Sequence, residues 1–132
     1  MVKEFIWKIR VYYEDTDAGG VIFYANYLRF MERARTEWLR DMGFEHKRLI
    51  DKYKLLFAVK NLTIDYIKPG YLDDLLTVTS KLLDSRGASL IFQQNIKNEN
   101  DELLSQAEIK VACINAKTLK ASPIPEELLM EL

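Results

Sequence analysis

Two aspartates and two glycines share a short loop ahead of the chain's one long amphipathic segment. Asp15 and Asp17 are followed by Gly19-Gly20, and the apolar spacing of a helix begins a few residues later. A helix start presents unpaired backbone N–H groups and a partial positive charge. A carboxylate near such a start can act as base or nucleophile on a carbonyl, while the N–H groups bind the developing oxyanion. The loop therefore predicts chemistry at a carbonyl carbon.

Histidine and cysteine chemistry is limited by the counts of these residues. His46 is the single histidine and lies in the polar run Glu45-His46-Lys47-Arg48, so we expect it at the surface. Nothing near it supports a Ser–His or Cys–His pair, and one histidine cannot build a zinc site on histidines. Cys113 is the single cysteine, which excludes an internal disulfide and a cysteine metal cluster. The sequence predicts neither a metal nor a cofactor.

The residues on either side of the loop predict one strand and one long helix. Alternation from Phe5 to Tyr13 indicates a half-buried strand, with Tyr13 on its apolar face. The helix is predicted from Asn26 to Met42, with Asn26 as N-cap and Gly43 as the C-terminal stop. A wide apolar stripe indicates that other structure covers this helix. The stripe consists of Tyr27, Phe30, Met31, Ala34, Trp38 and Met42.

Further strands follow an irregular connection in the second half of the chain. They are predicted at Leu56–Ile67, Leu75–Leu83, Ser89–Ile96 and Leu103–Ile114. Lys60-Asn61 interrupts the first of these, where a β-bulge would fit. The short turns between strands favour an antiparallel sheet, whose edges can be protected by pairing across a dimer. The expected fold class is α+β, with one long helix against a curled antiparallel sheet of about five strands.

Composition and charge fit a single domain over residues 1–132. The 132 residues are 48% hydrophobic, which is ample for a core. With 19 basic and 20 acidic residues, the net charge of -1 gives no reason to expect nucleic-acid or membrane-surface binding. The first residues, MVKEFIWKIR, carry charges every few positions and predict neither a signal peptide nor a membrane span. The expected location is the cytoplasm.

The loop and helix together resemble one family of enzymes. The segments RVYYEDTDAGGV and ERARTEWLR are similar to the hot-dog-fold acyl-CoA thioesterases, above all to the YbgC-type group associated with the Tol–Pal system of Gram-negative bacteria. LDDLL at 72–76, SRGASLIFQQ at 85–94 and VAC at 111–113 extend the likeness over nearly the whole chain. The resemblance implies a hot-dog fold, a sheet wrapped around a central helix. It also implies homodimers or homotetramers that pair their sheets and hold active sites at the interface.

The resemblance implies a role for several single residues. Asp17 matches the second aspartate of the family's D-x-D-x-x-G pattern and would be the catalytic carboxylate. The backbone N–H near Tyr24 would polarise the thioester carbonyl, and the hydroxyls of Tyr13 and Tyr24 would position substrate or water. Arg86 and Ser89 lie where related enzymes contact the CoA moiety. The implied reaction is hydrolysis of an acyl-CoA to free acid and CoA, in which Asp17 attacks the carbonyl or activates water.

One departure from the YbgC pattern bears on the mechanism and on the acyl group. Where YbgC-type enzymes have tyrosine and then histidine, this chain has Phe23-Tyr24. The run Tyr24-Ala25-Asn26-Tyr27 is similar to 4-hydroxybenzoyl-CoA thioesterase instead, so aliphatic and aromatic acyl groups both stay open. A thiol leaves readily because its pKa is about 8.5, so one carboxylate without a histidine can suffice. Phe57, Val59 and Ile64 are candidates to line the acyl pocket.

Other interpretations of the same residues stay open at this point. Asp15 and Asp17 can shape the loop through Asx-turns, and for Asp15 this structural role is the expected one. The loop also imitates the opening of an EF-hand calcium site. It departs at Gly19, in the fifth position, and at Asn26, where a bidentate glutamate is required. A non-catalytic protein that binds acyl groups or a protein partner is a further alternative, and acyl carrier protein is an alternative carrier to CoA.

Overall fold

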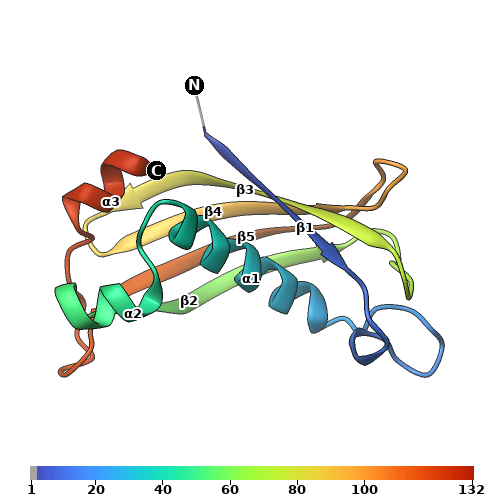
Figure 1. Cartoon of the computed structure of the whole chain (residues 1–132), viewed down its shortest axis with the longest axis horizontal. Coiled ribbons are helices and arrows are strands. Elements are labelled where there is room, and N and C mark those ends of the chain that lie inside the picture. Colours follow the sequence, from blue (N-terminus) through green and yellow to red (C-terminus); the bar gives the residue numbers. More distant parts are fainter. Residues whose placement is uncertain (1–2) are drawn as a thin grey trace.

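A computed structural model describes residues 3–132 as one sheet with a long helix lying along one of its faces (Figure 1). The elements, in chain order, are β1 (Glu4–Arg10), a 3-10 turn (Tyr13–Asp15), α1 (Asn26–Asp41), α2 (His46–Arg48), a π-helical turn (Leu49–Tyr53), β2 (Leu55–Tyr66), β3 (Leu75–Arg86), β4 (Ser89–Lys97), β5 (Leu103–Asn115) and α3 (Glu126–Glu131). Among these described residues, no helix is both long enough and apolar enough to cross a membrane.

The five strands form an antiparallel sheet in the order β1-β3-β4-β5-β2. The register of β2 against β5 shifts between Val59 and Asn61, which confirms the predicted bulge at Lys60-Asn61. The α+β class is also confirmed. The expected curl does not carry the sheet around the helix, because β1 and β2 are separate edges that do not meet. The sheet therefore has two edges, and β2 is the longer edge strand.

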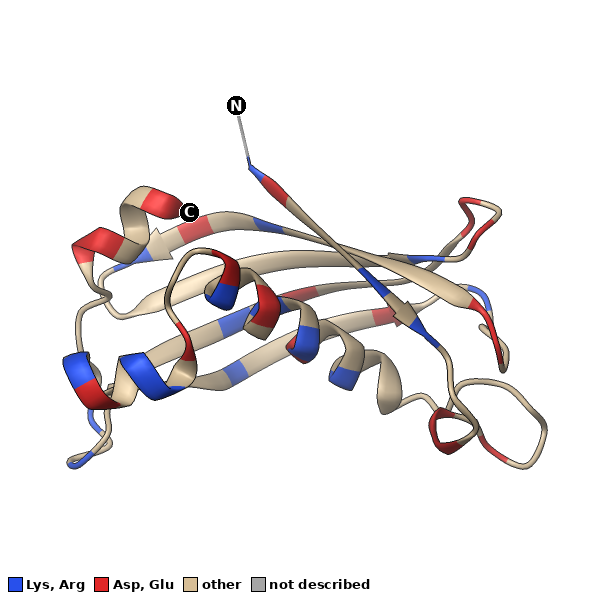
Figure 2. Ribbon diagram, viewed as in Figure 1, with Lys and Arg blue, Asp and Glu red and all other residues tan. Residues whose placement is uncertain are grey.

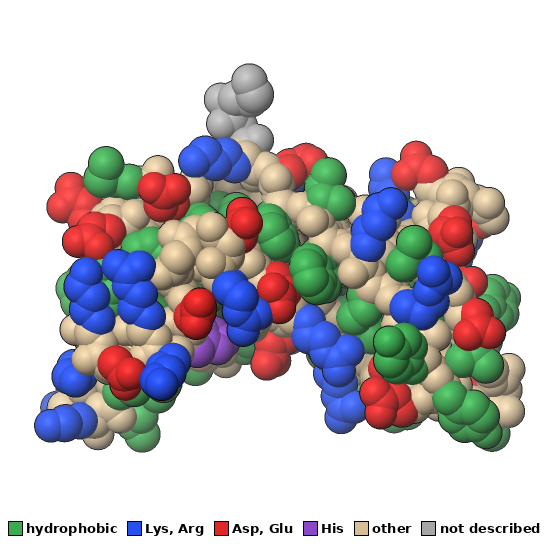
Figure 3. Space-filling view, viewed as in Figure 1, with side chains coloured by type: hydrophobic (Ala, Val, Ile, Leu, Met, Phe, Trp, Pro, Cys, Tyr) green, Lys and Arg blue, Asp and Glu red, His purple; other side chains and the backbone are tan. Residues whose placement is uncertain are grey.

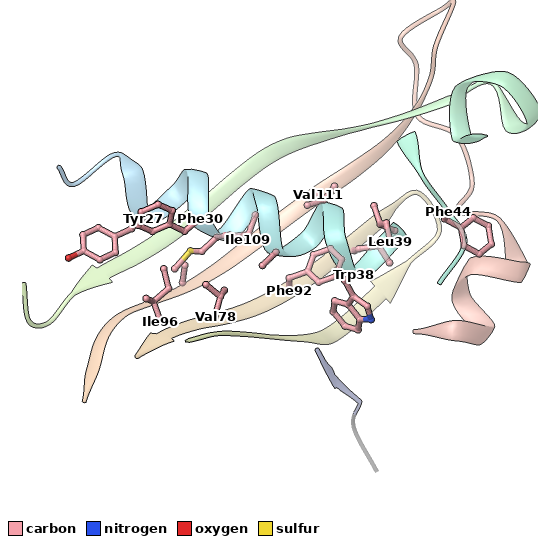
Figure 4. Close-up of a cluster of buried hydrophobic side chains, with 14 of the residues drawn as sticks. Tyr27, Phe30, Trp38, Leu39, Phe44, Val78, Phe92, Ile96, Ile109 and Val111 are labelled. Atoms are coloured by element: carbon pink, nitrogen blue, oxygen red, sulfur yellow. The ribbon is translucent and has the colours of Figure 1, made fainter. Parts of the chain in front are cut away.

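The apolar stripe of α1 packs on the sheet and makes the core (Figure 4). Trp38 stacks on Phe5 of β1 with ring centroids 6.0 Å apart, and meets Phe92 of β4 edge-on at 5.8 Å. At the other end of the helix, the buried Tyr27 packs against Tyr66 of β2 at 5.6 Å. The helix is therefore fixed to three strands, which sets the position of its first turn. Its fully buried residues are Phe30, Met31 and Ala34.

The predicted end of the first strand and the predicted N-cap are wrong, although α1 starts at Asn26 as predicted, and Asp15 binds the chain at both places. β1 ends at Arg10, and Tyr13 lies in the 3-10 turn with 83% of its surface exposed, not on the apolar face of the strand. Asn26 is not the N-cap but the first residue of α1, and its side chain is buried. The carboxylate of Asp15 accepts hydrogen bonds from both sides, which bends the chain after β1 and draws Asn26 inward.

Candidate active site

The loop between β1 and α1 is folded around the buried carboxylate of Asp15. Its Oδ2 accepts a hydrogen bond from the Tyr12 N–H at 2.8 Å, and its Oδ1 accepts one from Asn26 Nδ2 at 2.9 Å. Its carbonyl accepts the Phe23 N–H at 2.9 Å. One residue therefore joins the end of β1 to the start of α1. Both carboxylate oxygens face N–H donors, an arrangement unsuited to calcium, and no metal-ligand cluster lies within residues 3–132.

Asp17 lies at the exposed tip of the same loop. Its N–H donates to the Val21 carbonyl at 2.9 Å, and the Gly20 N–H donates to the Asp17 carbonyl at 3.1 Å. Gly20 closes this small hairpin at φ 79°, a conformation that favours glycine. Asp17 Oδ1 accepts the Gly19 N–H at 2.8 Å in an Asx-turn. Oδ2 has no hydrogen-bond partner among residues 3–132, so this oxygen is available to a substrate or a water molecule.

The hairpin is fastened to the segment that precedes β3. The Ile22 N–H donates to the Gly70 carbonyl at 2.9 Å, and the Gly70 N–H donates to the Tyr27 hydroxyl at 3.0 Å. A Cβ at Gly70 would lie 2.4 Å from Ile22 Cδ1 and 3.1 Å from Leu104 Cδ1, so a larger residue would force these side chains to move. Burial raises the pKa of the Tyr27 phenol, which keeps it protonated. These contacts hold the Asp17 hairpin in a fixed position relative to the first turn of α1.

The residues just before α1 carry open backbone donors and exposed tyrosines. The N–H groups of Tyr24 and Ala25 have no hydrogen-bond partner within the described range 3–132, as is usual at a helix start. The Tyr24 side chain is 63% exposed, and its ring contacts Phe23 at 4.8 Å and Tyr66 at 6.2 Å. Tyr13 is more exposed still. Three of the predicted site residues, Asp17, Tyr24 and Tyr13, therefore share one loop.

Arg86 and Ser89 lie at the opposite end of the sheet from Asp17. β3 begins at Leu75, beside the Asp17 loop, and reaches Arg86 roughly 35 Å further on at the usual rise of a strand. Ser89 is the register partner of Arg86 across the β3–β4 hairpin. The Arg86 Nε donates to Asp84 Oδ2 at 2.7 Å, and this bond lowers the pKa of Asp84. A single chain therefore does not bring the predicted CoA-binding residues to the predicted catalytic carboxylate.

The charges differ between these two ends (Figure 2). The loop from 11 to 25 contains acidic residues and no lysine or arginine. The other end of the sheet carries Arg86, and the nearby helix α2 contributes the exposed Lys47 and Arg48. Cationic groups for the phosphates of CoA are therefore absent from the loop that carries Asp17.

A cavity of about 140 Å³ opens between α1 and β2, at the end of the sheet away from Asp17. It lies beside His46, the purple side chain in Figure 3. Phe57 and Val59, two of the three predicted acyl-pocket residues, line it, whereas Ile64 does not. The remaining lining comes from α1, β4 and β5. These residues are Glu32, Arg35, Thr36, Leu39, Leu90, Phe92 and Val111.

A buried polar network, which sequence reasoning missed, lies behind this cavity. Arg35 Nη1 donates to Gln94 Oε1 at 2.8 Å. Gln94 Nε2 donates to the Met31 carbonyl at 2.9 Å and to Ser80 Oγ at 2.8 Å, and both Gln94 and Ser80 are fully buried. One signal in the sequence could have revealed it, because Gln94 falls on the apolar face of its strand. The neighbours on that face are Leu90, Phe92 and Ile96.

Cys113 and His46 take no part in the loop. Cys113 is buried in β5, and burial raises the pKa of its thiol to about 11. The thiol is therefore protonated at neutral pH and unsuited to act as a nucleophile. His46 is exposed at the start of α2, at the end of the molecule away from Asp17.

Comparison with known proteins gives a consistent result. The profile of the Thioesterase-like superfamily matches residues 11–132. The acyl-CoA thioesterase YbgC of Haemophilus influenzae is 45% identical over 94% of this chain and 90% of its own length. The acyl-CoA thioester hydrolase YbgC of Escherichia coli O6:H1 is 42% identical over 96% of this chain and 94% of its own. The crystal structure of a probable thioesterase from Bartonella henselae superposes with a TM-score of 0.87 at 33% identity, covering 95% of this chain and 100% of that one.

Proposed function

This chain belongs to the thioesterase-like superfamily and is an acyl-CoA thioester hydrolase, and we propose that Asp17 supplies the carboxylate of its reaction. The observation that carries this proposal is the arrangement of the loop. Asp17 is exposed on a hairpin that backbone bonds fix against the start of α1, and one of its oxygens has no protein partner within residues 3–132. The retained carboxylate also disfavours the alternative of a non-catalytic acyl-binding protein.

The reaction uses the carboxylate and the helix start together. Asp17 either attacks the thioester carbonyl to form a mixed anhydride, which water then hydrolyses to the free acid and the carboxylate, or takes a proton from a water molecule that attacks the carbonyl. In both routes CoA leaves as a thiolate. The open N–H groups of Tyr24 and Ala25 stabilise the oxyanion, a contribution of about 3–4 kcal/mol for each such donor. The hydroxyls of Tyr13 and Tyr24 position substrate or water. Because these N–H groups belong to the backbone, the Phe23-Tyr24 departure from the YbgC pattern leaves them in place.

The wild-type protein should release a free thiol from an acyl-CoA. A panel of short aliphatic, long aliphatic and aromatic acyl-CoAs, followed with a thiol reagent, measures this and selects between the aliphatic and the 4-hydroxybenzoyl alternatives. Cys113 is buried and should contribute little background. Absence of turnover on every acyl-CoA, with turnover on an acyl-carrier-protein thioester, would move the proposal to that carrier. The Tol–Pal association and the cytoplasmic location stay predictions from the sequence.

We also propose that the active site is assembled by a homodimer through the β2 edges. Tyr66 at one end of β2 packs on Tyr24, whereas Phe57 at the other end lines the cavity. Two copies of β2 paired antiparallel about a two-fold axis place each end beside the opposite end of its partner. The Asp17 loop of one protomer then lies beside the cavity of the other. This pairing brings together Asp17 and the candidate acyl pocket, which one chain keeps apart, whereas Arg86 on β3 is separated from this edge by β4 and β5.

A dimer should therefore be the smallest active species. Light scattering should give at least about twice the 15.5 kDa chain mass, and activity per chain should fall on dilution below the dimer dissociation constant. The reason is that a separated chain holds Asp17 at one end and the cavity at the other. Activity per chain that is unchanged in a protein shown to be monomeric would contradict the shared site.

A further inference from the structure

We propose that Arg35 is a specificity-determining residue, which donates a hydrogen bond to an oxygen at the far end of a short acyl group seated in the cavity between α1 and β2. The inference rests on the proposed thioesterase function and names the part of the substrate that this cavity would recognise. It concerns the acyl group alone and assigns Arg35 no part in the hydrolytic step.

The Arg35 guanidinium has an unusual position. It lies partly buried at the cavity wall, and Gln94 Oε1 is the one acceptor that it meets among residues 3–132. A guanidinium has five N–H donors, and a charged group that loses water without gaining acceptors costs free energy. Burial lowers the pKa of Arg35, an effect that the nearby Glu32 opposes. The remaining donors are therefore available to an oxygen acceptor that enters the cavity.

The buried polar network holds Arg35 in place. The Gln94 side chain that accepts from Arg35 is itself fixed by Met31 and Ser80, in a fully buried part of the core. A donor held by packed neighbours loses little conformational freedom when it binds a ligand. The guanidinium therefore resembles a pre-positioned recognition group more than a mobile surface arginine.

The size and lining of the cavity fit a short acyl group. Its volume of about 140 Å³ is close to that of an engineered apolar cavity that binds benzene. Phe57, Phe92 and Val111 contribute apolar lining, and Arg35 and Glu32 contribute charged lining. A group of roughly six heavy atoms with an oxygen at its far end matches both the volume and this mixed lining.

The test compares matched six-carbon substrates on the wild-type dimer. Hexanoyl-CoA lacks a terminal oxygen, whereas 6-hydroxyhexanoyl-CoA and adipoyl-CoA carry a hydroxyl and a carboxylate there. Wild type should prefer at least one oxygen-bearing substrate by about 10- to 100-fold in kcat/KM, the usual effect of a hydrogen bond to a charged donor. The preferred substrate of the two identifies the oxygen group. Equal kcat/KM on all three, from an active enzyme, would overturn the inference without touching the thioesterase function.

In the variant Arg35→Met that preference should be lost, so kcat/KM should fall by about 10- to 100-fold more on the preferred substrate than on hexanoyl-CoA. Arg40→Met is the matched control, because Arg40 lies on the same helix, pairs with Glu37 at the surface and does not line the cavity. It should keep the wild-type preference. If Arg35→Met lowers kcat/KM equally on all three substrates, Arg35 has a structural role. If the variant dimer dissociates more readily but keeps the substrate preference, Arg35 contacts the partner subunit and not the acyl group. Either result would overturn the inference. Should Arg35→Met unfold, Arg35→Lys, which keeps the charge but not the planar fork, should show a reduced preference.

A heterodimer of Asp17→Asn with Arg35→Met tests whether the two residues meet across the interface. The heterodimer is purified through a different tag on each chain. If each active site combines Asp17 of one protomer with the cavity of the other, one of the two sites has both residues intact and the other site has lost both. It should then show about half of the wild-type activity on the preferred substrate. If each active site instead used Asp17 and the cavity of the same chain, neither site would be intact, and only the Arg35→Met chain would keep its Asp17. Activity at or below half that of the Arg35→Met homodimer would therefore overturn the shared arrangement.

Discussion

Replacement of Asp17 by asparagine should reduce kcat for acyl-CoA hydrolysis by about 10²–10⁴-fold, the usual contribution of a positioned base or carboxylate. The side chain is exposed, and an asparagine Oδ1 can still accept the Gly19 N–H bond of the Asx-turn. The loop should therefore keep its shape while the reacting oxygen is lost. Thiol release at saturating acyl-CoA measures kcat, and thermal unfolding should show a midpoint close to that of wild type.

Asp51→Asn is a suitable control for this substitution. Asp51 is also exposed, but it lies in the π-helical turn after α2, away from the loop that carries Asp17. Its asparagine variant should hydrolyse acyl-CoA like the wild-type protein. Turnover that survives in the Asp17→Asn variant would remove Asp17 from the mechanism. If the Asp17→Asn variant is unfolded, the Asx-turn of Asp17 contributes more to stability than the exposure of this side chain indicates.

The second large effect is on stability, through Asp15. Asp15→Asn should lower the free energy of unfolding by roughly 2–4 kcal/mol, because an amide presents a donor where the carboxylate accepts from two N–H groups. Those donors are the Tyr12 N–H and Asn26 Nδ2, and Asp15 is only 3% exposed. Urea unfolding followed by circular dichroism gives the change, which should appear as a lower midpoint with an unchanged slope.

The reciprocal exchange of Asp15 and Asn26 provides the control. Asn26→Asp alone replaces the amide donor of the 2.9 Å hydrogen bond with a second carboxylate that faces Asp15. The two like charges should repel, so this variant should also be destabilised. Combined with Asp15→Asn it restores one acceptor and one donor between the two positions, and the amide oxygen introduced by Asp15→Asn can still accept the Tyr12 N–H. The double variant should recover at least half of the lost stability. Simple addition of the two single losses would show that this hydrogen bond is not what joins the loop to α1.

Much of the fold was predictable because it depends on neighbours in the sequence. The stripe from Tyr27 to Trp38, the alternation of β5 and the bulge after Val59 are local patterns, and the structure confirms them. The errors arose where a distant group intervenes. Tyr13 leaves the strand and Asn26 turns inward because the Asp15 carboxylate binds both sides of the loop, and no local propensity encodes that bond.

The site divides in the same way. The sequence alone determined the family, the loop, and Asp17 as its candidate carboxylate, since residue types and spacing within one short segment carry that information. Tertiary structure decided that Arg86 lies at the far end of the sheet from Asp17, and that Arg35 meets Gln94 at a cavity wall. These placements follow from strand register and helix packing. Strand register and helix packing both depend on burying side chains that are far apart in the chain. The spacing of residues within one segment therefore does not predict them.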